Sequence, residues 1–196
     1  MKPALVILAG GASERLGEPK ALVELGGRSV LDRLLDAAAN LDRVPLVIGG
    51  AHYAAIAKAL GGRGECANNV EWTRGRTGSV ILAARLREDR DLCLAPVDVP
   101  LVPREVFEAL AAAWEAAGSP PRGWLAPACD GRFGHPVVVG RELLRQLFGA
   151  SPDRPLRELR GLADPLWSLE TPCAAVLDDL DTPADLAALR ARASSP

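Results

Sequence analysis

The sequence predicts an α/β fold with a mostly parallel central sheet and helices on both faces. Short apolar runs alternate along the chain with longer segments of helical periodicity, as a parallel sheet with crossover helices requires. Several of the runs are continuous in Val, Ile and Leu, which is typical of strands covered on both faces. The 196 residues, 48% hydrophobic and 24% charged, have the composition of an ordinary globular protein, and we expect one domain over residues 1–196.

The apolar runs predict strands at residues 4–9, 45–49, 91–95, 123–127 and 136–139. The helical patterns between and after them predict helices at residues 29–40, 51–60, 79–87, 104–117, 141–148 and 183–193. The last helix has the clearest beginning, because Thr182 can cap it, Pro183 takes its first position and Asp185 lies in its first turn. Residues 151–173 show no pattern clear enough for a prediction.

Composition also excludes several classes of partner. A net charge of −2 and a pI near 5.8 give no basic surface for nucleic acid or an anionic membrane, so we expect neither as a partner. The first apolar run is too short to span a bilayer and lacks the features of a secretory signal. Four scattered cysteines without a CxxC pair indicate reduced thiols, and the expected location is cytoplasmic. They are Cys66, Cys93, Cys129 and Cys173.

A glycine-rich segment, residues 8–20, directly follows the first strand and reads LAGGASERLGEPK. Gly10 and Gly11 allow a phosphate or a base to approach the backbone. Ser13 can hydrogen-bond a phosphate, while Arg15 and Lys20 can neutralise a triphosphate. Neither a P-loop nor a dinucleotide-binding fingerprint fits the glycine spacing. A tight strand-to-helix turn with incidental charges is the remaining alternative.

This segment resembles the signature of the nucleotidyltransferases that attach CMP or GMP to molybdopterin, L-A-[AG]-G-x-S-x-R-[ML]-G followed by a lysine. The resemblance implies a Rossmann-like nucleotidyltransferase domain with its nucleotide pocket at the carboxyl ends of the strands. It further implies that Arg15 and Lys20 hold the phosphates and that Ser13 belongs to the same nucleotide site. The backbone that would contact the base is that of Leu8, Ala9, Gly10 and Gly11.

Two aspartates fit a magnesium site. Asp98 follows the predicted strand at 91–95, and carboxylates at the carboxyl end of a strand can hold Mg²⁺ together with substrate phosphates. Taken alone, Asp98 could equally cap the following helix. In the resembling family this aspartate binds the metal, and a D-[IL]-D-T-P stretch matches Asp181 just before the cap Thr182. The resemblance therefore implies Mg²⁺ as cofactor, with Asp98 and Asp181 as its ligands.

Two further stretches extend the resemblance. Residues 68–80 resemble the N-P-x-[WY]-x-x-G-x-x-x-S-[LV] loop, although Asn69 is followed by valine where the family has proline. This match implies nucleotide contacts at Asn69, Gly78 and Ser79, at a helix start suited to anions. The G-x-x-G-H-P pattern implies that His135 and Pro136 contact the acceptor, whereas His52 is interpreted as structural.

The implied reaction is transfer of a nucleoside monophosphate from an NTP to the phosphate of molybdopterin with release of pyrophosphate. Arg15, Lys20 and Asp98 would be its catalytic residues. Gly10-Gly11 resembles the guanylyl branch, but the loop at 75–79, the GHP stretch and Asp179-Leu180-Asp181 resemble the cytidylyl branch, so CTP is favoured over GTP. A molybdoenzyme apoprotein or its chaperone is a further possible partner.

Two alternatives stay open. The first is another small phosphorylated acceptor, such as a sugar phosphate or a cofactor precursor, because the family's G-D-x-G-[AV]-R motif is altered here to residues 151–159. In that stretch, Arg154 and Arg157 either contact the acceptor or form a charged helical face. The second alternative is a non-catalytic nucleotide- or molybdopterin-binding maturation factor.

Overall fold

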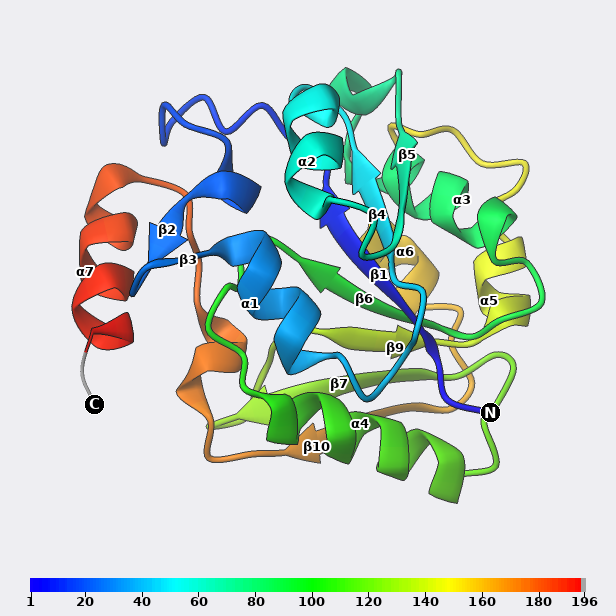
Figure 1. Ribbon diagram of the computed structural model, residues 1–196. Coiled ribbons are helices and arrows are strands. Elements are labelled where there is room, and N and C mark those ends of the chain that lie inside the picture. Colours follow the sequence, from blue (N-terminus) through cyan, green and yellow to red (C-terminus); the bar gives the residue numbers. More distant parts are fainter. Residues whose placement is uncertain (195–196) are drawn as a thin grey trace.

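The computed structural model describes residues 1–194 and is built around an eight-stranded sheet (Figure 1). The strand order is β10-β7-β9-β6-β1-β4-β5, and the short β8 pairs with β7. The strands are β1 (Ala4–Ala9), β4 (Leu46–Gly49), β5 (Glu65–Asn68), β6 (Leu92–Pro96), β7 (Trp124–Cys129), β8 (Arg132–Phe133), β9 (Val137–Val139) and β10 (Leu166–Glu170). A separate hairpin joins β2 (Glu24–Leu25) to β3 (Arg28–Ser29).

Most of the strands run in the same direction, as predicted. β1 is parallel to both β4 and β6, β4 is parallel to β5, and β7 is parallel to β10. β9 is antiparallel to both of its neighbours, β6 and β7, and β8 is antiparallel to β7. Because β1, β4 and β6 are adjacent and parallel, the loops that follow them emerge side by side at one edge of the sheet.

Seven α-helices are described, and the six predicted from the sequence are among them. They are α1 (Val30–Ala37), α2 (Tyr53–Leu60), α3 (Arg76–Leu86), α4 (Arg104–Ala116), α5 (Arg141–Arg145), α6 (Leu156–Arg160) and α7 (Pro183–Ala193). Three 3₁₀ turns accompany them: η1 (Lys20–Leu22), η2 (Trp72–Arg74) and η3 (Ala174–Leu177).

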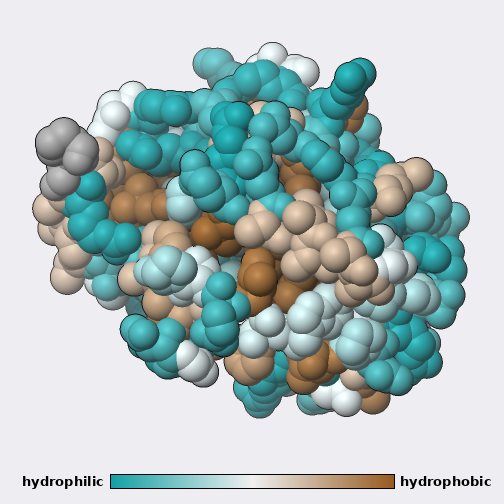
Figure 2. Space-filling model, turned by 90° about the horizontal axis from the view of Figure 1, so that it is seen from below, coloured by the Kyte–Doolittle hydropathy of each residue, from teal (hydrophilic) through white to brown (hydrophobic). Residues whose placement is uncertain are grey.

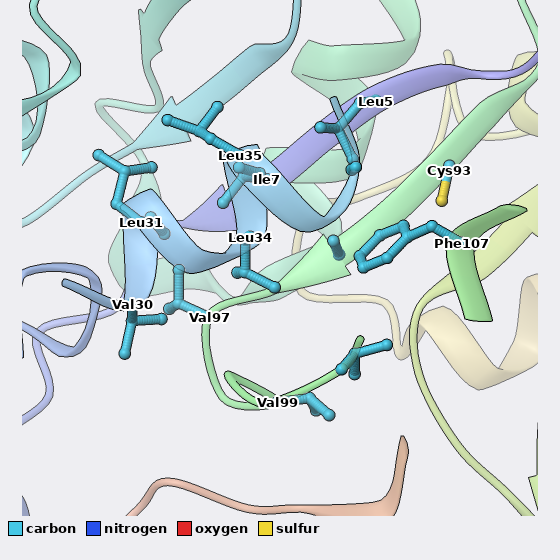
Figure 3. Packing of buried hydrophobic residues seen from close by; sticks show 14 of the residues in the cluster. Leu5, Ile7, Val30, Leu31, Leu34, Leu35, Cys93, Val97, Val99 and Phe107 are labelled. Atoms are coloured by element: carbon cyan, nitrogen blue, oxygen red, sulfur yellow. The ribbon is translucent and has the colours of Figure 1, made fainter. Parts of the chain in front are cut away.

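The core consists of two apolar clusters, one on each face of the sheet. Along β1 the side chains alternate between them: Leu5 and Ile7 belong to the first cluster, Val6 and Leu8 to the second. Helices α1, α2, α4 and α7 contribute to the first cluster, and α3, α5 and α6 to the second. Figure 3 shows side chains of the first cluster packed together between the sheet and α1 and α4. Both faces of the sheet are therefore covered by helices, as the continuous apolar runs predicted.

Some element bounds differ from the prediction, each for a local reason. α1 ends at Ala37 rather than residue 40, and α5 at Arg145 rather than residue 148. In both places the backbone tightens into turns, with Ala39 N–H bonded to the Asp36 carbonyl and Leu147 N–H to the Leu144 carbonyl. α3 begins at Arg76 rather than residue 79.

The stretch without a prediction contains α6 and β10, and β10 forms an outer edge of the sheet. β10 lies at the lower edge in Figure 1, and Figure 2 shows hydrophobic residues in the middle of the face seen from below. Leu166 of β10 is 46% exposed. Within residues 1–194, no helix combines the length and the apolar character needed to cross a bilayer.

Candidate active site

A cleft of ≈ 450 Å³ opens where β1, β4 and β6 end. Its walls come from the loop after β1, the start of α2, the segment from η2 to α3, and the residues that follow β6. Ten of the residues predicted from the sequence line it: Leu8, Ala9, Gly10, Gly11, Ser13, Arg15, Lys20, Ser79, Asp98 and Asp181. The other four predicted residues do not: Asn69, Gly78, His135 and Pro136.

The glycine-rich loop is held in shape by its own backbone and by Ser13. Ser13 adopts a positive φ of 57°, and its carbonyl accepts from the N–H groups of Leu16 and Gly17. Its hydroxyl accepts from the N–H of Lys20 at 3.2 Å. A ring nitrogen of His52, in the opposite wall, lies 2.9 Å from the carbonyl oxygen of Ala12. Ser13 and His52 therefore both fix the loop, which brings Lys20 to the cleft.

Glycines allow the loop to pack closely on its neighbours. A Cβ at Gly50 would lie 2.3 Å from the Gly10 carbonyl oxygen, so no side chain fits there. A Cβ at Gly10 would lie 3.0 Å from Oγ of Ser79. That hydroxyl in turn accepts from Nδ2 of the buried Asn69 at 3.0 Å. Asn69 thus lies behind the cleft and supports Ser79, and Gly78 lies against Asn69, which is why neither of them lines the cavity.

The mouth of the cleft carries a chain of alternating charges. Lys20 Nζ lies 2.9 Å from Asp98 Oδ1 and 2.5 Å from Asp181 Oδ1. Arg15 Nη2 lies 2.5 Å from the second oxygen of Asp181, and Arg76 Nη2 lies 2.7 Å from the second oxygen of Asp98. The order around the mouth is therefore Arg15, Asp181, Lys20, Asp98, Arg76, with three cations on two carboxylates.

The charged state of this chain is stable in the folded protein. Burial opposes the charge on Lys20, but its hydrogen bonds and ion pairs with Asp181 and Asp98 outweigh it, so the pKa of Lys20 is raised. The hydrogen bond from Lys20 is the main reason why the pKa of Asp181 is lowered, with a further contribution from Arg15. Lys20 is the least exposed member, at 11%, and lies at the centre of the chain.

The two carboxylates suit a hard divalent cation. Both converge on one ammonium group, so their oxygens are close enough to share a small cation in the same place. Mg²⁺ usually takes one or two protein carboxylates and fills its remaining positions with water and substrate phosphates. Residues 1–194 contain no group of three or more His, Cys, Asp or Glu side chains placed for a metal, so any ion here would need such external ligands. Asp98 and Asp181 therefore fit Mg²⁺ bound together with a nucleotide.

His135 and Pro136 lie beside the cleft, at the Asp98 end of the charge chain. They are joined by a cis peptide bond, and the His135 N–H donates to the carbonyl of Val176. Burial, and the nearby charge of Arg76, lower the pKa of His135 to about 4, while Asp98 acts in the opposite direction. Nδ1 of His135 is buried and has no hydrogen-bond partner among the described residues. The ring is therefore a neutral group next to Asp98 and Arg76.

Sequence reasoning missed Arg76, Trp72 and Thr73, which also line the cleft. Arg76 occupies an unspecified position of the loop motif, and its contact with Asp98 bridges 22 residues, so spacing alone gave no signal for it. Of the two arginines left open, Arg154 pairs with Glu158 one turn further along, at 2.6 Å, as expected for a charged helical face.

Comparison with known proteins gives the family. The model of the MobA-like NTP transferase domain matches residues 5–166. The chain belongs to this family. It is a nucleotidyltransferase with the predicted α/β fold.

Two curated relatives match parts of the chain. The bifunctional protein GlmU of Rhodopseudomonas palustris (strain ATCC BAA-98 / CGA009) is 35% identical over 112 residues, 54% of this chain and 25% of that protein. The molybdenum cofactor guanylyltransferase of Rhizobium meliloti (strain 1021) is 59% identical over 34 residues, 17% of this chain and 16% of that protein. The match thus spans about a quarter of the length of GlmU.

Solved structures share the fold along almost the whole chain. Rv0371c of Mycobacterium tuberculosis H37Rv superposes with a TM-score of 0.79 at 24% identity, over 97% of this chain and 99% of that one. Molybdopterin-guanine dinucleotide biosynthesis protein A of Archaeoglobus fulgidus gives 0.73 at 19%, over 97% and 98%. The 2-C-methyl-D-erythritol 4-phosphate cytidylyltransferase of Thermus thermophilus gives 0.69 at 19%, over the full length of both.

Proposed function

We propose that this nucleotidyltransferase transfers a nucleoside monophosphate from an NTP, CTP in preference to GTP, to the phosphate of molybdopterin, with Mg²⁺ bound at Asp98 and Asp181. The observation that carries this proposal is the meeting of Lys20, Asp98 and Asp181 at the mouth of a cleft lined by the glycine-rich loop. An acceptor phosphate oxygen attacks the α-phosphorus of the NTP. The bond to the bridging oxygen then breaks, and pyrophosphate leaves with its electrons.

Catalysis rests on positioning and on charge. The loop backbone from Leu8 to Gly11 binds the base, while Arg15 and Lys20 hold the triphosphate and offset the negative charge that grows on the leaving pyrophosphate. Bound Mg²⁺ would supply further positive charge to the phosphate oxygens. Because Ser13 and His52 fix the loop, Lys20 needs little reorganisation before it meets the phosphates.

The preference for CTP is supported by the packing of Gly10. Gly10-Gly11 is the one motif that resembles the guanylyl branch. In this protein a side chain at Gly10 would crowd the Ser79 hydroxyl, so packing alone accounts for the glycine, which then carries little information on the base. The relatives' names include both guanylyl and cytidylyl enzymes, so a comparison of the nucleotides has to decide.

The proposal is tested by pyrophosphate release with Mg²⁺ and molybdopterin, comparing CTP, GTP, ATP and UTP. We expect release with CTP, and GTP as the sole productive nucleotide would refute the assigned preference. If all four nucleotides bind and none is turned over, the acceptor is wrong or the protein only binds nucleotide. A panel of sugar phosphates would then separate these two cases.

Asp98→Asn tests the metal assignment. The change keeps the shape of the side chain but removes the charge that would bind Mg²⁺, so we expect release to fall by about 10²-fold or more. Asp36→Asn is the matched control, since Asp36 is an exposed helix residue that pairs with Arg28 away from the cleft. Full activity of Asp98→Asn would contradict the assignment of Asp98 to the metal.

A further inference from the structure

Arg76 is the cation at the cleft mouth that no sequence motif explains. It is the first residue of α3, directly after Gly75, whose φ is +119°. From there its guanidinium reaches Asp98 Oδ2 at 2.7 Å, and its side chain remains 50% exposed. Among residues 1–194 Asp98 is its one ion-pair partner.

The charge chain has two distinct ends. At one end Arg15 belongs to the glycine-rich loop and pairs with Asp181. At the other end Arg76 belongs to α3 and pairs with Asp98, and the charges of both act on the ring of His135. Lys20 lies between the two carboxylates, so Arg15 and Arg76 are on opposite sides of it. The triphosphate-binding loop and the His135 side of the cleft are therefore served by different arginines.

A cation bound to the carboxylates changes the situation of Arg76. Three protein cations face two carboxylates, so the mouth already has an excess of positive charge without a ligand. If a divalent ion takes the charge of Asp98, Arg76 loses its partner while it remains half-exposed. A planar guanidinium with free donors is suited to bidentate binding of a phosphate group. His135 is neutral, so it neither repels Arg76 nor replaces it.

We propose that Arg76 binds the phosphate group of the acceptor, on the side of the α-phosphorus opposite the leaving pyrophosphate. This inference rests on the proposed function, since it names the acceptor subsite of the same cleft. In-line attack requires the acceptor to approach from the side away from the pyrophosphate. Arg15 and Lys20 come from the triphosphate-binding loop, whereas Arg76 stands at the other end. The half-exposed guanidinium, freed from Asp98, then orients the phosphate whose oxygen attacks.

The kinetic test compares Arg76→Gln with Arg76→Lys in full-length protein. For Arg76→Gln we expect the KM for the acceptor to rise about tenfold or more, while the KM for the NTP stays within about twofold. Arg76→Lys should recover part of the loss, because it restores the charge without the fork. A rise in the KM for the NTP instead would move Arg76 to the triphosphate site. An unchanged KM for both would remove it from either subsite.

A binding test needs no turnover and no knowledge of the acceptor. Inorganic phosphate is titrated calorimetrically into protein with Mg²⁺ and saturating α,β-methylene-CTP, which fills the triphosphate site. We expect the wild-type protein to bind phosphate and Arg76→Gln to bind it about tenfold more weakly or less. Arg85→Gln, which alters an arginine at the other end of α3, serves as control and should bind like the wild type.

Equal phosphate affinity in the wild type and Arg76→Gln, or no phosphate binding to the wild type, would overturn the assignment of Arg76. Failure of the proposed function has a different signature, namely no pyrophosphate release by the wild type with any nucleotide and acceptor. The two failures can therefore be told apart.

Discussion

At the scale of single residues, the sequence located the charged groups but not their pairing. Lys20, Asp98 and Asp181 were singled out from three separate segments by the chemistry that their motifs require. That Lys20 contacts both carboxylates depends on the folded positions of η1, the end of β6 and the start of α7, which no local spacing encodes. Arg76 was missed for the same reason, because it becomes part of the site only through its contact with Asp98.

His135 gives a prediction at this scale. Its pKa of about 4 lies below the ordinary 6.5, so between these values the unfolded chain binds a proton that the folded protein does not. The free energy of unfolding should therefore be highest above pH 6.5 and fall as the pH drops towards 4, with at most about 3 kcal/mol from this group.

The measurement is urea unfolding from pH 7 to 4 in EDTA, with His135→Asn as the comparison. Acidic groups contribute to the slope in both proteins, so the difference between the two slopes isolates the histidine. Arg76 and Asp98 act on the ring in both states of the cleft mouth, and EDTA excludes metal from it. Identical slopes between pH 6.5 and 4 would show that His135 titrates normally in the folded protein.

At the scale of elements, predictions succeeded where packing and local signals agree. β1 was predicted with its observed bounds, because an unbroken apolar run followed by glycines corresponds to a central strand buried on both faces. α7 was predicted with its observed bounds because its cap is encoded locally: Thr182 accepts from Asp185 N–H, and Asp185 bonds back to Thr182 N–H.

The missed elements lie where that agreement is absent. β5 is an edge strand with exposed polar ends at Glu65 and Asn68, so it lacks an apolar run. β10 is the opposite edge strand, and its side chains alternate between exposed and half-buried. It is stabilised by long-range contacts, such as the stacking of Trp167 on Trp114 at 5.3 Å. Both strands form because β4 and β7 present open hydrogen-bonding edges, which a sequence pattern cannot reveal.

The cap of α7 allows a prediction for an element. Thr182→Val keeps the methyl group and the β-branch but removes the hydroxyl that accepts from Asp185 N–H, so we expect about 1 kcal/mol less stability. Thr182→Ser keeps the hydroxyl and should stay within about 0.5 kcal/mol of the wild type. Denaturant unfolding of the three proteins measures both values. A larger loss for serine than for valine would assign the effect to packing of the methyl group.

At the scale of the whole molecule, the cleft joins distant parts of the chain. Its lining comes from the loop after β1, the start of α3, the end of β6 and Asp181 before α7, and the helices behind these segments share two clusters across one sheet. Parallel strands place the ends of β1, β4 and β6 at one edge, so the fold class alone predicted that these motifs would meet. Their order around the cleft mouth came only from the structure.

This arrangement predicts that ligand binding stabilises the whole chain rather than one part of it. A nucleotide with Mg²⁺ at about 100 times its Kd should raise the free energy of unfolding by about 2.7 kcal/mol, provided that it does not bind the unfolded chain. Because the sheet couples both clusters, far-UV circular dichroism and tryptophan fluorescence should report the same urea midpoint, with and without ligand. Asp98→Asn should lose most of the added stability if that carboxylate holds the ion. Two separate transitions, with the ligand shifting only one, would instead mean that the segments lining the cleft unfold apart from the rest of the sheet.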